Sequence, residues 1–370
     1  MSFALDDDQK AIRDLARGIF AATCDKEALD KLEAGGGFFS ASAWQAVSQS
    51  GLAGMAVAES AGGGGLGPIE QVMVLRMVGE HVAPVPVLES AVMAAPAVAA
   101  AGDEARSEWL PRVLTGDAIA TVALLEPDTR DLAAPTTVAT ADGLLRGTKT
   151  CVPWWGQADV IVLSATGPSG PGLWLVEKAA VSSNNAEIAR QKATDGQPLA
   201  EVRLSGVSAS QIGGYAELQA LLDRGVLGRC AIAWGVAKMA LRLTSEHARD
   251  RQQFGAPIGT FQAVSQRAGD MYIDTQAMEL ALLRAAFLLD PAQQAMAADL
   301  KESLLVARYF ATEAGHRVVA AAQHLHGGMG FDKDYPLYRY FLWSKRLEFA
   351  LGGGSAQLSR IGALIAAGRF

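Results

Sequence analysis

The sequence contains little cysteine: Cys24, Cys151 and Cys230 are the only three among its 370 residues. They lie far apart, form no CxxC pair and belong to no Cys/His cluster with the spacing of a zinc site. An odd number of scattered cysteines is typical of a protein in a reducing compartment. We therefore expect three free thiols, no disulfide and no bound metal.

The sequence also lacks an excess of positive charge and any long apolar run. Its 32 Lys and Arg against 39 Asp and Glu give a net charge of −7. Nucleic-acid binding needs a basic face, so this balance excludes that class and leaves room for one local anion pocket. Charges interrupt every apolar stretch before the roughly 20 residues that a membrane span needs. Because the acidic start MSFALDDDQK has no signal-peptide pattern either, we expect a cytoplasmic protein without membrane contact.

What the sequence does contain is ample material for several cores. Half of its residues are hydrophobic, and 370 residues are too many for one ordinary core. Residues 1–115 read mostly as helices, residues 116–215 as short β-branched runs between turn residues, and residues 216–370 as long helices. This order predicts an α+β fold with an N-terminal helical domain, a middle β domain and a C-terminal helical bundle.

The N-terminal region carries the clearest local signals. Asp6 with Gln9 three residues later predicts a capping box at the start of a helix. Four apolar residues then fall on one helical face, which we expect to be buried: Ile12, Leu15, Ile19 and Phe20. The stretch ESAGGGGLGP predicts a flexible glycine loop, and the helix IEQVMVLRMVGEHV follows it.

The C-terminal region predicts four helical stretches. They are expected at residues 221–251, 261–288 and 293–325 and from residue 336 onward. The segment VLGRCAIAWGVAKMALRL is apolar on more than one face, so it should be buried on most sides. We expect a bundle that packs against another subunit, and burial within one subunit is the alternative.

Two motifs point to a ligand. The first is RDRQQFGAPIGTFQAVSQRAGDM, where Arg251 follows a long helix and could hold a phosphate through two parallel hydrogen bonds. The second is QHLHGGMGFDKDYPLYRYF, where Gly327 and Gly328 allow close approach of a ligand to backbone N–H groups. From the residues alone, simple turn punctuation is the competing interpretation of both motifs.

Both motifs resemble signature segments of the acyl-CoA dehydrogenase family. RQQFG, with FQ and DM after it, is similar to RxxFG…FQ…DM, and LHGGMGF is similar to QIHGGxGF. The likeness covers the whole chain, since SGLAGMAVAESAGGGGLG resembles GLxGLxVPExxGGxG, with Glu59 at the Glu of that motif. LLEPD likewise resembles TEP, and GTKTCVPWWGQAD resembles GxKxWITNxxxAD. The resemblance implies the acyl-CoA dehydrogenase fold, with helical, β and four-helix domains, usually in a dimer of dimers.

The resemblance also implies FAD, bound in an extended form across a subunit interface. In the family, the flavin ring lies against the β domain of one subunit, and the pyrophosphate and adenosine reach the RxxFG and QIHGG segments of its neighbour. The positions here that would meet the FAD of the adjacent chain are Arg251, Gln253, Phe254, Ile258, Phe261, His324, Leu325, Gly327 and Gly328. His324 takes the place of the family's Gln and can still donate a hydrogen bond.

The base that this chemistry requires is missing. Acyl-CoA dehydrogenation needs a carboxylate beside the carbon next to the thioester. The tail SAQLSR aligns with the family's TxxIxR, which puts Gly353 at the catalytic Glu, and a count without a gap puts Leu351 there. Glu348 lies most of a helical turn too early, and we expect a solvated or paired side chain.

A second family position for the base is empty as well. Some members carry it on the helix before RxxFG, and that position is Gly225 here. The next residue, often an Arg that meets coenzyme A, is Val226. Asp223 lies close by, but an Asp223–Arg224 pair is usually a surface ion pair. Asp223 and Glu348 are the possible substitutes for the base, and neither is favoured.

The flavin side departs from the family too. The aromatic and hydroxyl residues of W-I-T/S, which cover the flavin ring, fall on Cys151, Val152 and Pro153. Proline offers neither an N–H nor a hydroxyl. Trp154 and Trp155 are alternatives for the wall of the flavin site, although we expect them to pack the β domain. The half that receives a neighbour's FAD is thus kept, and the half that would hold its own flavin, base and coenzyme A is degraded.

These features favour a non-catalytic partner subunit. The stretch DYPLYRYFLWSKRLEFALGG is similar to the small subunits of actinobacterial α2β2 acyl-CoA dehydrogenases that act on steroid side-chain thioesters. The implied partner is a catalytic subunit that binds most of the acyl-CoA, with electron-transfer flavoprotein as acceptor. Three alternatives are a self-sufficient dehydrogenase with a displaced base, a flavin monooxygenase on the same fold, and a scaffolding relative.

Overall fold

The computed structural model describes residues 4–368, and of residues 294–298 only the backbone. The chain divides into two compact units. The first, called here the helical unit, comprises Met1–Lys31, Pro68–Ala83 and Val226–Phe370. The second, called the sheet unit, comprises Leu32–Gly67 and Pro84–Gly225.

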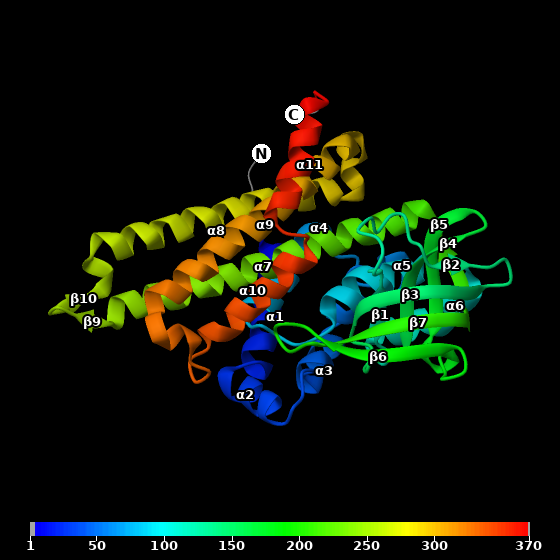
Figure 1. Ribbon diagram of the computed structural model, residues 1–370, viewed down its shortest axis with the longest axis horizontal. Helices are drawn as coiled ribbons and strands as arrows, with labels where there is room; N and C mark the ends of the chain where they lie inside the picture. The colour runs from blue at the N-terminus through cyan, green and yellow to red at the C-terminus, as the bar shows by residue number, and fades with distance from the viewer. Residues whose placement is uncertain (1–3, 369–370) are drawn as a thin grey trace. The chain divides into compact units, whose positions relative to one another are not determined.

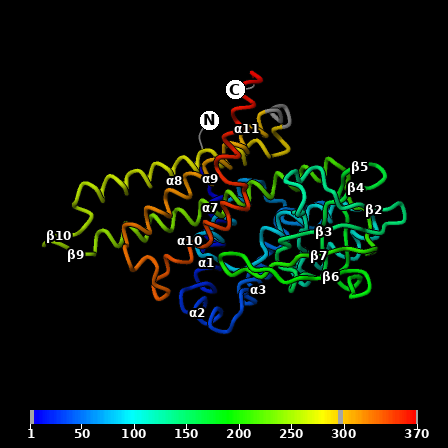
Figure 2. The backbone as a smooth tube through the Cα atoms, viewed as in Figure 1, coloured from blue at the N-terminus to red at the C-terminus, as the bar shows by residue number. Residues whose placement is uncertain are grey.

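The helical unit is built from long helices and one short hairpin (Figure 1). Helix α7 (Tyr215–Asp250) starts in the sheet unit and ends in this one. Most of α2 (Lys26–Ala34) also belongs here. The other elements are α1 (Asp7–Thr23), α4 (Pro68–Glu80), β9 (Gln252–Gln253), β10 (Ala256–Pro257), η5 (Ile258–Thr260), α8 (Gln262–Leu289), η6 (Pro291–Met296), α9 (Ala297–His326), η7 (Gly327–Phe331), α10 (Leu337–Ala350) and α11 (Gly354–Ala366). Helices α8 and α9 run side by side (Figure 2).

The sheet unit combines short helices with one large sheet. Its helices are α3 (Ala41–Gln49), η1 (Leu52–Gly54), η2 (Glu59–Ala61), the π-helix η3 (Val87–Ala94), α5 (Ala95–Ala99), α6 (Asp103–Thr115) and η4 (Lys178–Ala180). Its strands are β1 (Ala120–Ala123), β2 (Val138–Ala139), β3 (Leu144–Pro153), β4 (Val160–Gly167), β5 (Gly170–Glu177), β6 (Ala186–Lys192), β7 (Pro198–Ser208) and β8 (Ser210–Gly213).

The sheet is mixed. Its order is β6-β7-β3-β2-β4-β5-β8, and β1 pairs with β4 beside this path. β4 pairs in parallel with β1 and β2, and the other ladders are antiparallel. Side chains that alternate along these strands fill one core, which includes Leu145, Ile161, Leu163, Trp174 and Val202. The order helices, strands, helices along the chain confirms the α+β prediction.

Helices α4 and α7 approach each other closely because each has a glycine at the crossing. A Cβ on Gly79 would lie 2.1 Å from the carbonyl oxygen of Ile232, and a Cβ on Gly235 would lie 2.1 Å from that of Arg76. Neither helix could accept even an alanine there without moving its neighbour. Next to the crossing, the Arg76 guanidinium lies over the ring of Trp234, with 4.5 Å between its Cζ and the ring centroid.

Helix α1 starts as the sequence predicts. Asp6 accepts a hydrogen bond from the N–H of Gln9, and the Gln9 side chain accepts one from the N–H of Asp6, at 2.8 and 3.2 Å. The predicted buried face is partly wrong. Phe20 is buried as expected, but Leu15 is 43% exposed and Ala16 takes the inward position instead. The buried stripe is set by the elements that pack on it, which hydrophobicity alone does not specify.

The glycine loop is not the flexible segment that its composition predicts. It begins with η2 and folds back on the preceding chain: the N–H of Gly65 donates to the carbonyl of Val57, and that of Leu66 to Met55, both at 2.8 Å. A Cβ on Gly63 would lie 2.2 Å from the carbonyl oxygen of Val57. Glycine is needed here because two backbone segments pack closely against each other, and not because the loop must be mobile.

The alanine-rich part of α7 is already buried in the single chain. The buried residues of this segment are Leu227, Cys230, Ala231, Ile232, Ala233, Trp234, Val236, Ala237 and Ala240. No second subunit is required to cover these residues, so the alternative of burial within one subunit accounts for them. α7 also begins at Tyr215, earlier than the predicted residue 221. Within the described residues, no helix combines the length and apolar character that a bilayer span requires.

Candidate functional site

The first predicted ligand segment forms a tight hairpin between α7 and α8. Strands β9 and β10 pair in antiparallel fashion, with Gln253 opposite Ala256. The two residues between them, Phe254 and Gly255, have φ angles of 54° and 80°. Positive φ at both central positions is the geometry of a type I′ turn, the turn whose twist suits a two-residue hairpin. Glycine adopts positive φ readily, whereas phenylalanine rarely does, so the sequence FG predicts a turn here but does not dictate this turn type.

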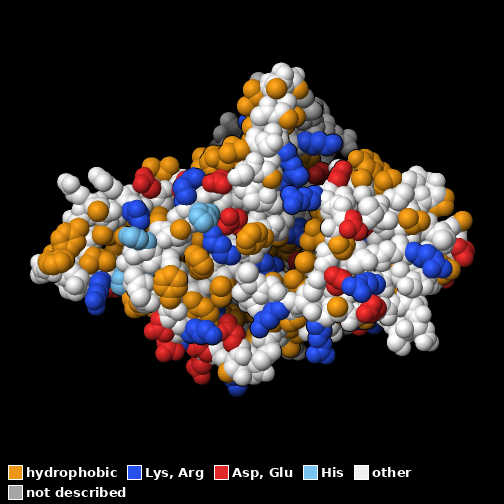
Figure 3. Space-filling model, in the orientation of Figure 1, with side chains coloured by type: hydrophobic (Ala, Val, Ile, Leu, Met, Phe, Trp, Pro, Cys, Tyr) orange, Lys and Arg blue, Asp and Glu red, His pale blue; other side chains and the backbone are white. Residues whose placement is uncertain are grey.

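The hairpin carries exposed side chains. Phe254 is 96% exposed, and its ring meets the edge of Phe261 at a centroid distance of 6.2 Å. Arg251 is exposed too, and the neighbouring Asp250 pairs with Arg249 instead. Figure 3 shows hydrophobic side chains where Figure 1 places β9 and β10. An exposed aromatic ring and an exposed guanidinium on one hairpin suit a ligand or partner surface rather than a core.

The second predicted segment is the end of α9 and the turn after it. His324 is exposed, and so are Gly327 and Gly328. Gly327 has a φ of 59°, and a Cβ on either glycine would meet nothing within 4 Å. Their backbone is therefore open to a ligand, as the sequence interpretation requires. Leu325 is half-buried beneath them.

The orientation of α9 also decides between two candidate polar residues. Gln323 is buried, and its Nε2 donates to the carbonyl oxygen of Gly330 at 2.9 Å. The Gln323 side chain therefore fixes the glycine turn from inside. This leaves His324 as the side chain that faces outward, in agreement with the alignment on the two glycines.

The two segments lie next to each other through a pair of histidines. His247 is one helical turn before Arg251, and His326 directly precedes Gly327. Their rings stack at a centroid distance of 4.4 Å and an interplanar angle of 20°. The sequence places His326 at the helix break before the two glycines, but a spacing of this length does not signal a contact with His247.

The glutamate of the LLEPD segment, Glu126, has a structural role. Glu126 is buried, and its Oε1 accepts hydrogen bonds from Nζ of Lys149 at 2.6 Å and from the N–H of Thr137 at 2.9 Å. Its Oε2 accepts from both the N–H and the hydroxyl of Thr136. Burial alone would raise the pKa of Glu126, but the bonds from Lys149, Thr137 and Thr136 outweigh it and lower the pKa to about 2. Glu126 is therefore a buried anion that connects strand β3 to the segment before β2 through hydrogen bonds.

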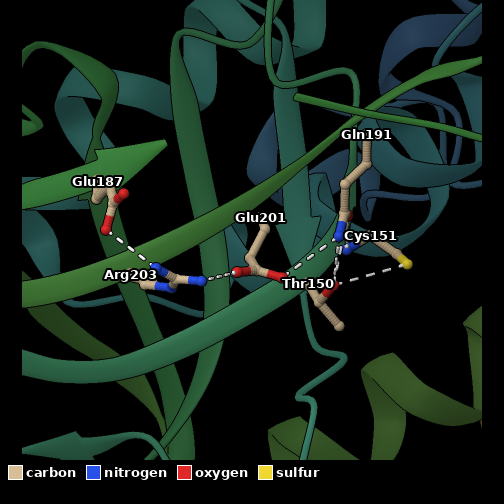
Figure 4. A network of polar contacts seen from close by, with 6 residues as sticks. All are labelled: Thr150, Cys151, Glu187, Gln191, Glu201 and Arg203. Atoms are coloured by element: carbon tan, nitrogen blue, oxygen red, sulfur yellow. Dashed lines mark hydrogen bonds and ion pairs between the residues drawn. The ribbon is translucent and has the colours of Figure 1, made fainter. Parts of the chain in front are cut away.

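The segment at the family's flavin-covering residues has an unusual backbone. Cys151 is exposed and has a φ of 52°, and the pairing of β3 with β7 shifts register between Lys149 and Val152. Figure 4 shows the polar network that holds this bulge. Gln191 accepts the N–H of Cys151 at 2.9 Å and bonds to the hydroxyl of Thr150. The network continues to Glu201, Arg203 and Glu187.

The groups that would meet a flavin are engaged elsewhere. Val152 is 1% exposed, and the carbonyl oxygen of Pro153 accepts the hydroxyl of Thr121 at 2.6 Å. Trp154 is buried at a φ of 55°, and its Nε1 donates to Glu89 at 3.0 Å. The rings of Phe38 and Phe39 pack on it at 5.7 and 6.1 Å. Trp154 thus packs against residues that precede the β domain, whereas Trp155 packs against the sheet core, as expected.

The predicted base positions carry no carboxylate. Gly353 has a φ of 71° and precedes α11, and Leu351 is buried. Gly225 lies inside α7. Within the described residues, no group of three or more His, Cys, Asp and Glu is placed to hold a metal ion in place of a base.

The two substitutes are poor bases. Glu348 accepts from Nζ of Lys345 at 2.8 Å and lies 3.3 Å from Nδ1 of His316. Burial would raise the pKa of Glu348, but Lys345 and His316 outweigh it and lower that pKa. Asp223 is half-buried, and its charge opposes the effect of burial, which lowers the pKa of Arg224. Both carboxylates thus lie beside cations, and for Glu348 the lowered pKa makes the carboxylate a weaker base.

A carboxylate that the sequence analysis missed lies next to the vacant base position. A Cβ on Gly354 would lie 1.8 Å from Oε1 of Glu313, which comes from α9. Glu313 therefore lies at the first turn of α11, where the helix dipole favours a negative charge. Its signal in the sequence is an ordinary helical glutamate, so only the packing of α9 on α11 identifies it.

Comparisons with known proteins agree with this architecture. Residues 6–117 match the acyl-CoA dehydrogenase N-terminal domain, and residues 213–365 match the acyl-CoA dehydrogenase C-terminal domain. The chain is 37% identical to acyl-CoA dehydrogenase FadE27 of Mycobacterium tuberculosis, over 98% of each chain. A structure of the Tcur3481-Tcur3483 steroid ACAD is 39% identical with a TM-score of 0.90, and covers 98% of each chain. The ChsE4-ChsE5 complex from Mycobacterium tuberculosis is 34% identical with a TM-score of 0.90, over 99% of each chain. The predicted fold is thereby confirmed.

Proposed function

The chain belongs to the acyl-CoA dehydrogenase family, and from this premise we propose that it is the non-catalytic subunit of a heteromeric enzyme. FAD is the cofactor of the family and, when bound, accepts the hydride from the acyl chain. The proposed enzyme introduces an α,β double bond into a coenzyme A thioester. The observation that carries the proposal is the glycine at position 353, where the reaction needs a carboxylate.

Half of an FAD site fits this chain. The exposed Phe254 and Arg251 offer a stacking surface and a phosphate ligand, and the open backbone of Gly327 and Gly328 can approach a pyrophosphate. We propose that this surface holds the adenosine and pyrophosphate of FAD whose flavin belongs to the partner. The residues in this role are Arg251, Gln253, Phe254, Ile258, Phe261, His324, Leu325, Gly327 and Gly328.

The other half of the site does not fit. The hydroxyl and aromatic groups that would cover a flavin ring are replaced at Cys151 to Pro153, and the neighbouring Trp154 is turned inward to Glu89. We derive no chemical step at this place. The proton acceptor and most of the acyl-CoA contacts therefore belong, in this proposal, to a catalytic acyl-CoA dehydrogenase subunit in an α2β2 assembly.

The names of the relatives support the partner and the substrate class. Two structures with more than 30% identity bear paired names, and one of these is called a steroid ACAD. We therefore propose a steroid side-chain coenzyme A thioester as substrate and electron-transfer flavoprotein as acceptor.

We also propose three domains, at residues 1–115, 116–215 and 216–370, of which the first and third consist mainly of helices.

The test is the FAD content of the chain alone and after co-expression with a catalytic acyl-CoA dehydrogenase subunit. We expect little flavin alone and one FAD for each pair of unlike chains. One FAD per chain in the isolated protein, with reductase activity, would instead indicate a self-sufficient enzyme that uses Asp223 or Glu348. Oxygen consumption with reduced flavin would indicate a monooxygenase.

A matched pair of variants makes the test specific. Arg251→Gln removes the proposed phosphate ligand, and Arg249→Gln removes a neighbouring exposed guanidinium that pairs with Asp250. We expect the first variant to lower the FAD content of the complex and the second to leave it unchanged. Equal FAD content in both variants would contradict a role for Arg251.

A further inference from the structure

The stacked histidines join the two proposed FAD segments. His247 lies on the last turn of α7, and its carbonyl oxygen accepts the N–H of Arg251 at 2.9 Å. His326 is the last residue of α9 and leads directly into Gly327. With 4.4 Å between the ring centroids, any shift of one helix end against the other separates the rings. The stack therefore sets the register of the RQQFG hairpin against the glycine turn.

The hydrogen bonds of His326 suit a neutral ring. A carbonyl oxygen can only accept, so Nδ1 donates its proton to the carbonyl of Ala322 at 2.8 Å. Nε2 lies 3.1 Å from the hydroxyl of Tyr335, which can donate to it. His326 is only 6% exposed, so both ring nitrogens have partners and little water reaches the ring. A neutral Nδ1–H tautomer satisfies these two contacts, whereas the carbonyl of Leu243, which also bonds to the ring, favours the protonated form.

The charges around the pair also favour neutral rings. Burial lowers the pKa of His247, and His326 and Arg251 lower it further, while Asp250 acts in the opposite direction. Burial likewise lowers the pKa of His326, against the backbone carbonyls of Ala322 and Leu243.

Two other titratable groups lie close to the pair. Tyr335 bonds to His326, and burial raises its pKa, with the charge of Glu246 acting in the same direction. Glu246 is thus a further carboxylate that acts on this cluster. A first proton on the stack opposes a second, because two like charges at this distance repel.

We propose that His247 and His326 are positioning residues for FAD, and that their stack as two neutral rings holds the hairpin and the glycine turn in binding register. Neither ring needs to touch FAD for this role. The inference rests on the proposed contribution of these segments to FAD binding. It adds a pH response, since protonation of the stack separates the rings and loosens the site.

The pH response has a definite sign. Both folded pKa values lie below the ordinary value for histidine, so the stack is fully formed above about pH 6.5. As the pH falls below that value, toward the lowered pKa values of the two histidines, the form with separated rings binds more protons than the stacked form. The population of the separated form therefore increases. A positive ring near a pyrophosphate would by itself tighten FAD binding. Tighter binding at acid pH is therefore the outcome that contradicts the proposal.

The first test uses the co-expressed complex. The dissociation constant of FAD is measured by flavin fluorescence between about pH 7.5 and about pH 5, and we expect an increase of about tenfold for each unit of pKa difference between bound and free forms. His247→Phe keeps an aromatic stack that cannot be charged, so its affinity should match the native complex at high pH and change less on acidification. His247→Ala should bind FAD more weakly at every pH.

The control is His316→Gln, which removes an exposed histidine that contacts Lys345 and Glu348 instead. Its pH profile should match that of the native complex. A native profile that is flat or rises in affinity toward acid, or a His247→Phe profile that falls like the native one, would overturn the proposal.

A second measurement separates this proposal from the proposed function. The chain has five histidines, so each ring can be titrated by NMR in the isolated protein without FAD or partner. We expect His247 and His326 to titrate below the ordinary value and His247→Phe to shift the titration of His326. If this coupling is present but the complex binds no FAD, the proposed function fails and the stack stands. If FAD binds across the two chains but the histidines titrate independently, the stack proposal fails alone.

Discussion

The carboxylate of Glu313 lies against the backbone of Gly354, in the first turn of the helix that follows the vacant base position. A Cβ at residue 354 would displace the Glu313 side chain, because it would fall 1.8 Å from Oε1 of Glu313. Glycine therefore occupies these two positions for different reasons. Gly353 has a φ of 71° and open space around it, whereas Gly354 is in close contact with the Glu313 side chain.

This contact predicts the effect of Gly354→Ala. The added methyl must displace the Glu313 carboxylate or move α11, which typically costs about 1 to 3 kcal/mol of unfolding free energy. Urea denaturation followed by circular dichroism measures the change. Gly362→Ala, on the same helix with nothing within 4 Å of the added Cβ, is the control and should be neutral or stabilising by up to about 1 kcal/mol. Equal stability of the two variants would show that Glu313 does not occupy this place.

The buried pair Glu126–Lys149 predicts an acid-dependent loss of stability. The pKa of Glu126 is lowered to about 2 from 4.5, so its contribution is complete above pH 4.5 and disappears as the pH falls toward 2. Glu126→Gln should remove part of this dependence, on the order of 2 to 3 kcal/mol at neutral pH. Chemical denaturation at a series of pH values measures it. Glu187→Gln, which affects only an exposed pair with Arg203, is the control and should leave the acid profile intact.

Breaking the same pair from the other side should be more severe. Lys149→Met leaves the buried Glu126 carboxylate without its cation, and such changes cost about 3 to 5 kcal/mol. The double variant Glu126→Gln with Lys149→Met should recover part of that loss, since it leaves no unpaired buried charge. The unfolding midpoints of the double variant and of Lys149→Met measure this recovery. A double variant that is no more stable than Lys149→Met would indicate that the pair is not coupled.

The cysteines predict one reactive thiol. Cys151 is exposed, whereas Cys24 and Cys230 are buried, and burial raises the pKa of Cys230 to about 12 despite the opposing charges of Arg308 and Arg229. Titration of the native protein with a thiol-specific disulfide reagent should therefore show one fast thiol and two that react only on unfolding. Cys151→Ser should abolish the fast phase, and a fast phase that persists in this variant would place another cysteine at the surface.

The hairpin tip predicts a separation of stability from cofactor binding. Phe254 is 96% exposed, so Phe254→Ala should leave the unfolding free energy of the isolated chain within about 0.5 kcal/mol of the native value. The FAD content of the complex should fall in the same variant, because the proposed stacking surface is gone. Phe349→Ala removes another exposed ring, 74% exposed and distant in sequence from the hairpin, and should not lower the FAD content. A loss of stability without a loss of FAD would contradict the proposal.

Much of the fold could be predicted because local signals agreed with it. The capping box at Asp6, the β-branched runs that became β1, β4, β5 and β7, and the long C-terminal helices all follow from residue chemistry along a short window. No such run predicted strands β3, β6 and β8. The sequence of β6, AEIARQK, is polar, and this strand is almost wholly exposed at the edge of the sheet. An edge strand is defined by its neighbour β7 rather than by its own pattern.

The candidate site divides in the same way. The residues along the chain predict a turn at Phe254-Gly255 and show that positions 353 and 225 carry no carboxylate. The stack of His247 on His326 and the position of Glu313 beside Gly354 emerge from helix packing and cannot be read along the chain. These contacts join residues far apart in the chain, and their formation depends on how whole helices pack. A sequence window carries the conformational preference of each residue, but it does not contain the distance between two helices.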